Sequence, residues 1–164
     1  NLSQPTAPGH FKEPTDLERP YEYDKALTFR LGSFFDPKSK GADLFSSFRN
    51  LFGFQYMFQN SIQSQYEIGA DLIKGQQGQV HFSKRWSTDT RSSLRSYAKL
   101  GLMFRTDARD GLATFTDHKN YFIKPAVGFE DTLKKGQSIR FDIELALSTD
   151  EVLAFITAGW VWGI

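Results

Sequence analysis

The feature that most constrains the fold of this chain is a two-residue alternation of apolar and polar side chains, which begins after Tyr23. It occurs in eight segments, which are residues 25–33, 52–59, 65–72, 80–86, 98–105, 121–130, 139–147 and 156–164. In the second segment, one face carries Phe52, Phe54, Tyr56 and Phe58, and the other carries Gly53, Gln55, Met57 and Gln59. A period of two is typical of β-strands, and about ten residues is the length that a tilted strand needs to cross a bilayer. The sequence therefore predicts an all-β fold of eight strands.

The composition excludes several other classes of protein. The chain has 164 residues, a formal net charge of +1 and no cysteine. One domain is expected at this length, and the near-neutral charge indicates neither nucleic acid nor an anionic surface as a partner. Disulfide scaffolds, thiol catalysis and metal sites with cysteine ligands are excluded. No apolar run approaches the roughly 18 residues of a membrane-spanning helix, whereas alternating barrel strands can be polar on average.

Alternation alone does not distinguish a transmembrane barrel from a soluble one. A soluble lipocalin-like lipid carrier also alternates, with its apolar face inside. Glycine recurs on the polar face, at Gly32, Gly53, Gly69, Gly101, Gly128, Gly159 and Gly163. Glycine weakens a strand and has no reason to recur on a solvated wall, but inside a narrow barrel it makes room for long charged neighbours. The apolar face also carries more large aromatic side chains than a small lumen could hold. We therefore predict a polar lumen and an outer wall that contacts lipid.

The last eight residues, Thr157 to Ile164, place Thr157, Gly159, Trp162 and Ile164 in the order polar, glycine, aromatic, hydrophobic. This pattern resembles the C-terminal signal of Gram-negative outer-membrane β-barrels, which the barrel-assembly machinery reads. The usual final residue is phenylalanine, and Ile164 departs from it. The resemblance covers residues 23–164 at the level of pattern and identifies no specific family. It implies a location in the bacterial outer membrane, with outer-membrane lipid, lipopolysaccharide and the assembly machinery as partners.

An open sheet edge is not viable in hydrocarbon, because every backbone donor and acceptor needs a partner within the protein. The predicted fold is therefore a closed, eight-stranded, antiparallel up-and-down transmembrane β-barrel over residues 23–164. Both termini are expected in the periplasm. The expected periplasmic turns are residues 60–64, 87–95 and 131–137, and the expected outer loops are residues 36–50, 74–78, 106–120 and 148–151.

Two local predictions accompany this topology. The first outer loop contains Leu44, Phe45, Phe48 and Leu51, which indicates either a short helix near the barrel mouth or an irregular continuation of the second strand. Aromatic residues near strand ends are expected to form the two interfacial belts. This set is Tyr21, Tyr23, Phe35, Tyr66, Trp86, Tyr97, Tyr121, Phe122, Trp160 and Trp162.

Charges of both signs lie on the predicted lumen face. The cations are Arg30, Arg85, Lys99, Arg105, Lys124 and Arg140, and the anions are Glu67, Asp71, Glu130, Asp142 and Glu144. An eight-stranded barrel is just wide enough to be filled by side chains, and charges buried there need partners. The sequence thus predicts a charge-paired lumen, with a narrow polar conduit for small solutes as the alternative.

A catalytic interpretation depends on His81 and Ser83, which lie on one face of the fourth segment. The pair resembles the His-x-Ser pair of outer-membrane lipid A deacylases, but it lies mid-chain, and no acidic partner is assignable by spacing. The alternative is two ordinary lumen residues. His10 and His118 have no ligand spacing around them, so neither a metal site nor a cofactor is expected, and no nucleic-acid motif is present.

Residues 1–22 differ from the rest of the chain, because they contain four of its six prolines, at Pro5, Pro8, Pro14 and Pro20. Proline removes backbone donors and fixes φ, which predicts an irregular, Pro-rich periplasmic arm. The arm is either a simple lead-in or a segment that packs on the barrel or recruits a protein partner. The resulting hypothesis is a non-enzymatic structural or interaction protein without an open pore, with a lipid-modifying enzyme or a channel as alternatives.

Overall fold

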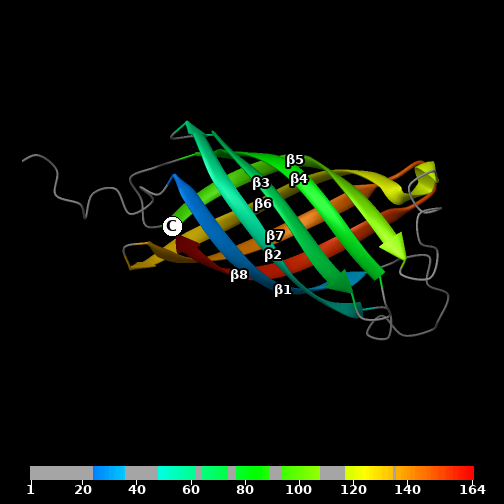
Figure 1. Ribbon diagram of the computed structural model, residues 1–164, viewed down its shortest axis with the longest axis horizontal. Helices are drawn as coiled ribbons and strands as arrows, with labels where there is room; N and C mark the ends of the chain where they lie inside the picture. The colour runs from blue at the N-terminus through cyan, green and yellow to red at the C-terminus, as the bar shows by residue number, and fades with distance from the viewer. Residues whose placement is uncertain are drawn as a thin grey trace, which may run out of the picture.

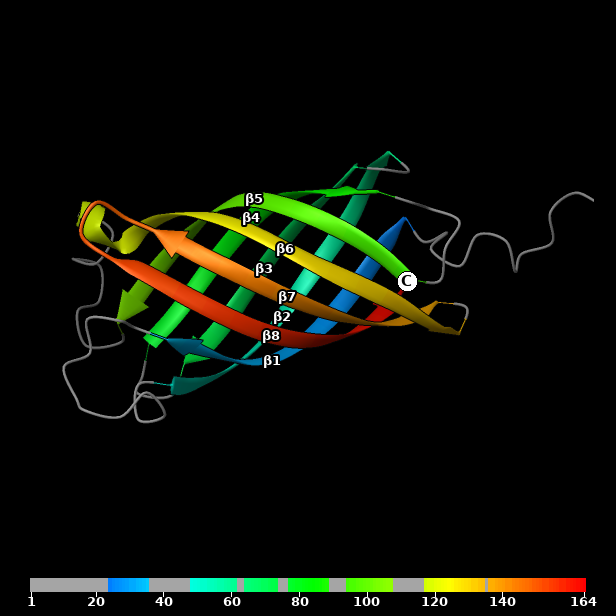
Figure 2. The same cartoon turned by 180° about the vertical axis from the view of Figure 1, so that it is seen from behind.

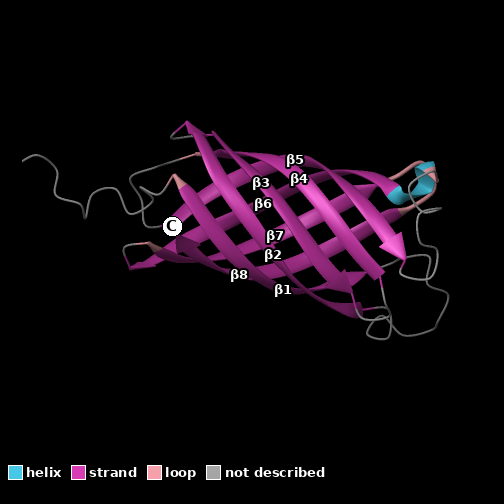
Figure 3. Ribbon diagram, in the orientation of Figure 1, coloured by secondary structure: helices cyan, strands magenta, loops and turns pink. Residues whose placement is uncertain are grey.

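The computed structural model describes residues 24–35, 48–61, 64–73, 77–88, 94–107, 117–134 and 136–164. These residues form eight strands and one short 3-10 helix, η4. The strands are β1 (Lys25–Phe35), β2 (Phe48–Ser61), β3 (Ser64–Ile73), β4 (Gln77–Ser87), β5 (Leu94–Asp107), β6 (Tyr121–Lys134), β7 (Gln137–Leu147) and β8 (Val152–Gly163), with η4 at His118–Asn120 (Figure 3). Within the described ranges, no helix is long and apolar enough to cross a membrane.

The strands form one closed barrel in which each strand pairs with its neighbours in sequence and β8 pairs with β1 (Figures 1 and 2). All eight pairings are antiparallel. The closing pair places Phe29 opposite Trp160 and Arg30 opposite Gly159. The prediction of a closed, eight-stranded, antiparallel up-and-down barrel is therefore confirmed.

One end of the barrel carries the C-terminus and the β6–β7 turn, and the other carries η4 (Figure 1). We call them the turn end and the loop end. The predicted Pro-rich arm, residues 1–22, lies outside the described residues.

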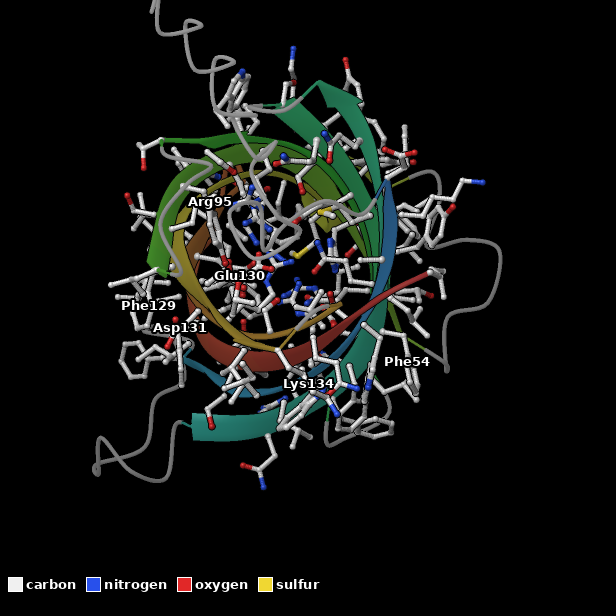
Figure 4. All side chains as sticks on the ribbon, turned by 90° about the vertical axis from the view of Figure 1, so that its left-hand side faces the viewer. Phe54, Arg95, Phe129, Glu130, Asp131 and Lys134 are labelled. Carbon is white, nitrogen blue, oxygen red and sulfur yellow. The ribbon has the colours of Figure 1, made fainter. Side chains whose placement is uncertain are left out.

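Burial alternates along every strand as the two-residue period requires. In β3, Glu67 and Asp71 are buried, whereas Ile68 and Leu72 are 47% and 55% exposed. A view along the barrel shows Arg95 and Glu130 pointing inward and Phe54 and Phe129 pointing outward (Figure 4). Charged residues therefore lie inside and apolar residues outside, which is the reverse of the lipocalin-like arrangement.

The structure corrects several predicted boundaries. Strand β2 begins at Phe48 and contains Leu51, so these two residues continue the second strand and do not form a helix, whereas Leu44 and Phe45 lie outside the described residues. Strand β6 continues to Lys134, because pairing with β7 persists through a register shift between Thr132 and Lys134. The predicted turn of residues 131–137 is correspondingly shorter.

The assignment of Tyr97 and Phe122 to the interfacial belts is wrong. Both are buried inside the barrel, at 3% and 2% exposure. Each lies two residues from a lumen lysine, Lys99 or Lys124, and therefore shares its face. The two-residue period therefore predicts the face of an aromatic side chain better than its position near a strand end does.

The lumen is not polar throughout, which the sequence analysis missed. A cluster of buried apolar side chains fills it near the loop end, namely Phe34, Leu51, Ile73, Met103, Phe122, Ala146, Leu153 and Phe155. The rings of Phe34 and Phe155 stack with centroids 5.7 Å apart. We call this set the loop-end apolar cluster. A smaller cluster of Ala26, Met57 and Val161 lies inside the barrel nearer the turn end. The fully buried charged side chains therefore occupy the part of the lumen between these clusters and around the turn end.

Candidate functional site

The barrel lumen brings together most of the charged residues that the sequence placed on its face. Ten are buried, namely Arg30, Glu67, Asp71, Arg85, Lys99, Lys124, Glu130, Arg140, Asp142 and Glu144. Strands β1, β3, β4, β5, β6 and β7 each contribute at least one of them. The eleventh, Arg105, is half-buried at the loop end and forms a 2.8 Å ion pair with Glu151.

Glu67 is the anion with the most varied partners. Arg140 donates to both of its oxygens, at 2.9 and 3.3 Å. Arg85 and Lys99 approach it within 3.5 and 3.6 Å, and the Gln55 amide also donates to it. Glu67 of β3 thus joins groups from β2, β4, β5 and β7.

A second centre forms around Glu144. Arg30, Lys99 and Lys124 each place a nitrogen within 2.9 Å of its carboxylate. Lys99 lies equally close to Asp142, at 2.8 Å, and so links the two carboxylates. Since Lys99 also approaches Glu67, the two centres form one continuous network.

The network extends toward the turn end through Glu130. Arg85 forms a 2.6 Å ion pair with Glu130, and Arg95 lies 4.0 Å from the same carboxylate. Sequence analysis missed Arg95 because it assigned residues 87–95 to a turn. Two-residue spacing from Tyr97 and Lys99 would have placed it in the lumen.

Tyr97 is the second functional residue that sequence analysis missed. Its hydroxyl donates to Asp142 at 2.8 Å, and the Arg85 guanidinium lies over its ring, 3.8 Å from the centroid. The ring therefore packs against a cation while the hydroxyl pairs with an anion. The Tyr97 side chain packs directly against Gly128, because a Cβ added to Gly128 would lie 2.6 Å from the Tyr97 hydroxyl.

The buried charges nearly balance among the described lumen residues. The cations are Arg30, Arg85, Arg95, Lys99, Lys124 and Arg140, against the anions Glu67, Asp71, Glu130, Asp142 and Glu144. Removing one partner of a buried pair leaves an uncompensated charge, which costs about 3–5 kcal/mol. The dense pairing therefore holds the side chains in one arrangement across the barrel axis.

His81 and Ser83 both lie in the lumen, but they do not form a serine–histidine pair. The Ser83 hydroxyl donates to Glu67 at 3.5 Å, whereas His81 Nε2 lies 3.3 Å from Asp71 and 3.2 Å from Arg30. A serine nucleophile needs a base within hydrogen-bond reach. Each residue instead contacts the charge network, and each is at most 5% exposed.

The C-terminal residues follow the same two faces. Thr157 and Gly159 are buried, whereas Trp162 and Ile164 are 38% and 73% exposed on the outer wall. Thr157 accepts a hydrogen bond from Arg30 at 3.4 Å, which connects this segment to the network. Among the described residues, no group of three or more potential ligands could hold a metal ion.

No family model matches the chain, and no curated protein matches it by sequence. Its backbone is similar to solved barrels. Neisserial surface protein A gives a TM-score of 0.65 at 8% identity, over 86% of this chain and 97% of the other. The N-terminal β-barrel domain of Pseudomonas aeruginosa OprF gives 0.60 at 9% identity, over 85% and 98%.

The de novo designed barrel TMB2.3 gives a TM-score of 0.60 at 12% identity, over 87% of this chain and 94% of that one. A structure from the de novo design of transmembrane β-barrels gives a TM-score of 0.58 at 10% identity, over 87% of this chain and 98% of that one. The fold is that of a transmembrane β-barrel. Since natural and designed chains share this fold, it does not fix an activity.

Proposed function

We propose that this protein is a non-enzymatic integral barrel of the bacterial outer membrane, with a closed lumen, that acts as a structural or interaction protein. The observation that carries the proposal is the filling of the lumen at two levels. The charge network crosses the barrel through Arg140 and Glu67, and the loop-end apolar cluster lies beyond it. A conduit would need a continuous row of polar groups that are free to solvate an ion.

Several observations support the location. The outward faces of all eight strands carry exposed large hydrophobic residues, including Leu102 and Ile143 at 65% and 60% exposure. An apolar band of this kind is what a bilayer-spanning barrel presents to lipid. The C-terminal pattern of Thr157, Gly159, Trp162 and Ile164 supports delivery by the barrel-assembly machinery, with both termini in the periplasm. Outer-membrane lipid and lipopolysaccharide would then surround the wall, and a protein partner would bind through the arm or outer loops.

Conductance across a planar lipid bilayer tests the closed lumen. We expect the inserted full chain to give no discrete current steps, because paired charges and the apolar cluster block the axis. Phe122→Ala combined with Phe155→Ala removes two rings of the cluster and serves as the matched, more open variant. Regular current steps from the unaltered chain would contradict the proposal and favour a small-solute channel.

The non-enzymatic part is tested with lipopolysaccharide. Cells that produce the unaltered chain and cells that produce Ser83→Ala should show the same lipid A acylation by mass spectrometry. This expectation follows from the contacts of Ser83 and His81, which join them to Glu67 and Asp71 and not to one another. Loss of an acyl chain only in cells with the unaltered protein would support the deacylase-like alternative.

A further inference from the structure

The seam between β6 and β7 is interrupted within the barrel wall. The ladder pairs Ile123 with Leu147 and Ala126 with Glu144, in the same register, but has no residue pair between them. Each of the other seams pairs residue by residue from mid-strand to its loop end. Strands β6 and β7 lie side by side on the wall that faces the viewer in Figure 2.

Pro125 accounts for the interruption. Proline has no amide hydrogen, and within sheets it is normally confined to edges and bulges. Water cannot replace a missing ladder hydrogen bond in hydrocarbon. On the loop side of Pro125, the single Ile123–Leu147 pair joins the two strands. This end of the seam therefore has little backbone pairing to keep it closed.

An apolar pocket of about 440 Å³ lies at the same place. Its lining includes Leu102, Ile123 and Leu147 from the outer wall, and Met103 and Phe122 from the loop-end apolar cluster. Ser148 and Thr149, which follow β7, complete it together with Tyr121. The pocket therefore lies on the lipid-facing wall beside the interrupted seam, next to two residues whose side chains belong to the lumen, and its volume is in the roughly 300–1,000 Å³ range of small-molecule sites.

We propose that this pocket binds an acyl chain of a lipid from the surrounding bilayer, which inserts sideways at the β6–β7 seam. The site rests on the proposed membrane location, in which Leu102 and Ile123, 65% and 54% exposed, face hydrocarbon. Water is excluded because an apolar hollow gives it no hydrogen-bond partners. An acyl chain fills the space and restores the dispersion contacts that an empty hollow would lose. Ser148 and Thr149 follow β7 at the loop end, where the polar part of the same lipid would lie.

Photo-crosslinking in a bilayer tests this site. The full chain is refolded into phosphatidylcholine vesicles that contain a phosphatidylcholine with a diazirine on one acyl chain, and adducts are mapped by mass spectrometry. We expect adducts on residues 121–123 and 147–149 to exceed those on Leu31 and Leu72, which face lipid near the loop ends of β1 and β3, by about fivefold. That ratio corresponds to about 1 kcal/mol of additional contact energy.

Two variants act on the site in different ways. Leu147→Trp fills the pocket and should bring the ratio of adducts close to one. The matched change Leu27→Trp, on the outward face of β1 and away from the pocket, should leave the ratio unchanged. Pro125→Val restores an amide donor at the seam and should also lower the ratio. A heat-modifiability gel shows that each variant has folded, so that the unaltered chain and Pro125→Val decide the question if Leu147→Trp does not fold.

Even labelling of all lipid-facing strands in the unaltered chain, or a ratio that is unchanged in both Leu147→Trp and Pro125→Val, would overturn the acyl-chain site. The proposed closed lumen would be unaffected by either result. An absence of adducts on every strand would instead overturn the membrane location as well as the site.

Discussion

Arg140 of β7 and Glu67 of β3 form a double hydrogen bond across the lumen, with Nη1–Oε1 and Nη2–Oε2 distances of 2.9 and 3.3 Å. A planar guanidinium matches a carboxylate in this geometry, and both groups are withdrawn from water. Because β3 and β7 are not neighbours in the barrel, the contact braces opposite parts of the wall. Further cations from β4 and β5 meet the same carboxylate, so Glu67 is a central element of the network.

Glu67→Gln should therefore destabilise the barrel strongly. It removes the charge that compensates Arg140, Arg85 and Lys99, and we expect a loss of about 3–5 kcal/mol in the free energy of unfolding. Urea unfolding in lipid vesicles, followed by tryptophan fluorescence, measures the change. Glu151→Gln is the matched control, because its pair with Arg105 lies partly in solvent and should contribute at most about 1 kcal/mol. Equal losses in both variants would contradict the network's structural role.

Tyr97→Phe isolates the hydroxyl that donates to Asp142. The ring and its contact with Arg85 remain, so the expected loss in unfolding free energy is that of a hydrogen bond to a charged group, about 1.5–3 kcal/mol. Tyr66→Phe provides the comparison, because Tyr66 lies on the outer wall beside Phe58 and Phe82 and should be almost insensitive. If the two variants unfold alike, Tyr97 does not act as a bridge in the network.

Gly128→Ala tests the close approach of Tyr97 to the barrel wall. The new Cβ would collide with the Phe141 carbonyl oxygen and the Tyr97 side chain. Overpacking of this kind typically costs about 1–3 kcal/mol. Gly78→Ala meets its nearest neighbour, Thr106 Cγ2, at 3.3 Å and should be tolerated much better. Refolding yield and urea midpoint are the measurements, and a harmless Gly128→Ala would show that the wall has more room than the structure indicates.

Arginine substitutions on the outer wall should reveal its depth in the bilayer. Ile143 lies mid-strand and is 60% exposed, so Ile143→Arg should cost about 2–4 kcal/mol of unfolding free energy in vesicles. Leu133 lies next to the turn end of β6, and Leu133→Arg should cost only about 0–1 kcal/mol. A cost that is equal at both depths, or absent at Ile143, would argue against a spanning orientation.

The two-residue period was sufficient to predict the eight strands and to place on the lumen face ten of the eleven charged residues that are buried in the described part of the chain. The same period also places Arg95 and Tyr97 on the face of Lys99, but Arg95 fell in the predicted turn of residues 87–95 and Tyr97 in a predicted aromatic belt. Which charges meet was not predictable in the same way. The contact between Arg30 of β1 and Glu144 of β7 depends on the tilt and stagger of the strands. The spacing of residues within one segment does not determine either quantity.

The loop-end apolar cluster was missed for a different reason. Phe34, Met103 and Phe155 lie on the lumen face, where the period allows any residue type, and they meet only because strands distant in sequence converge at one end of the barrel. The interruption at Pro125 is similar. The sequence shows a proline in the sixth segment, but the loss of pairing that it causes is apparent only in the ladder between β6 and β7.

The most direct test of the account is a spin-label scan along the outward face of β7, which is straightforward because the chain has no native cysteine. Single cysteines replace Phe141, Ile143 and Leu145 in vesicle-embedded protein, with Asp150→Cys in the β7–β8 connection as the exposed control. The account predicts that the three strand labels collide frequently with oxygen and are shielded from a water-soluble nickel chelate, whereas the control label shows the reverse. Access of the chelate to the label at residue 143 would contradict a wall that faces lipid around a charge-filled lumen.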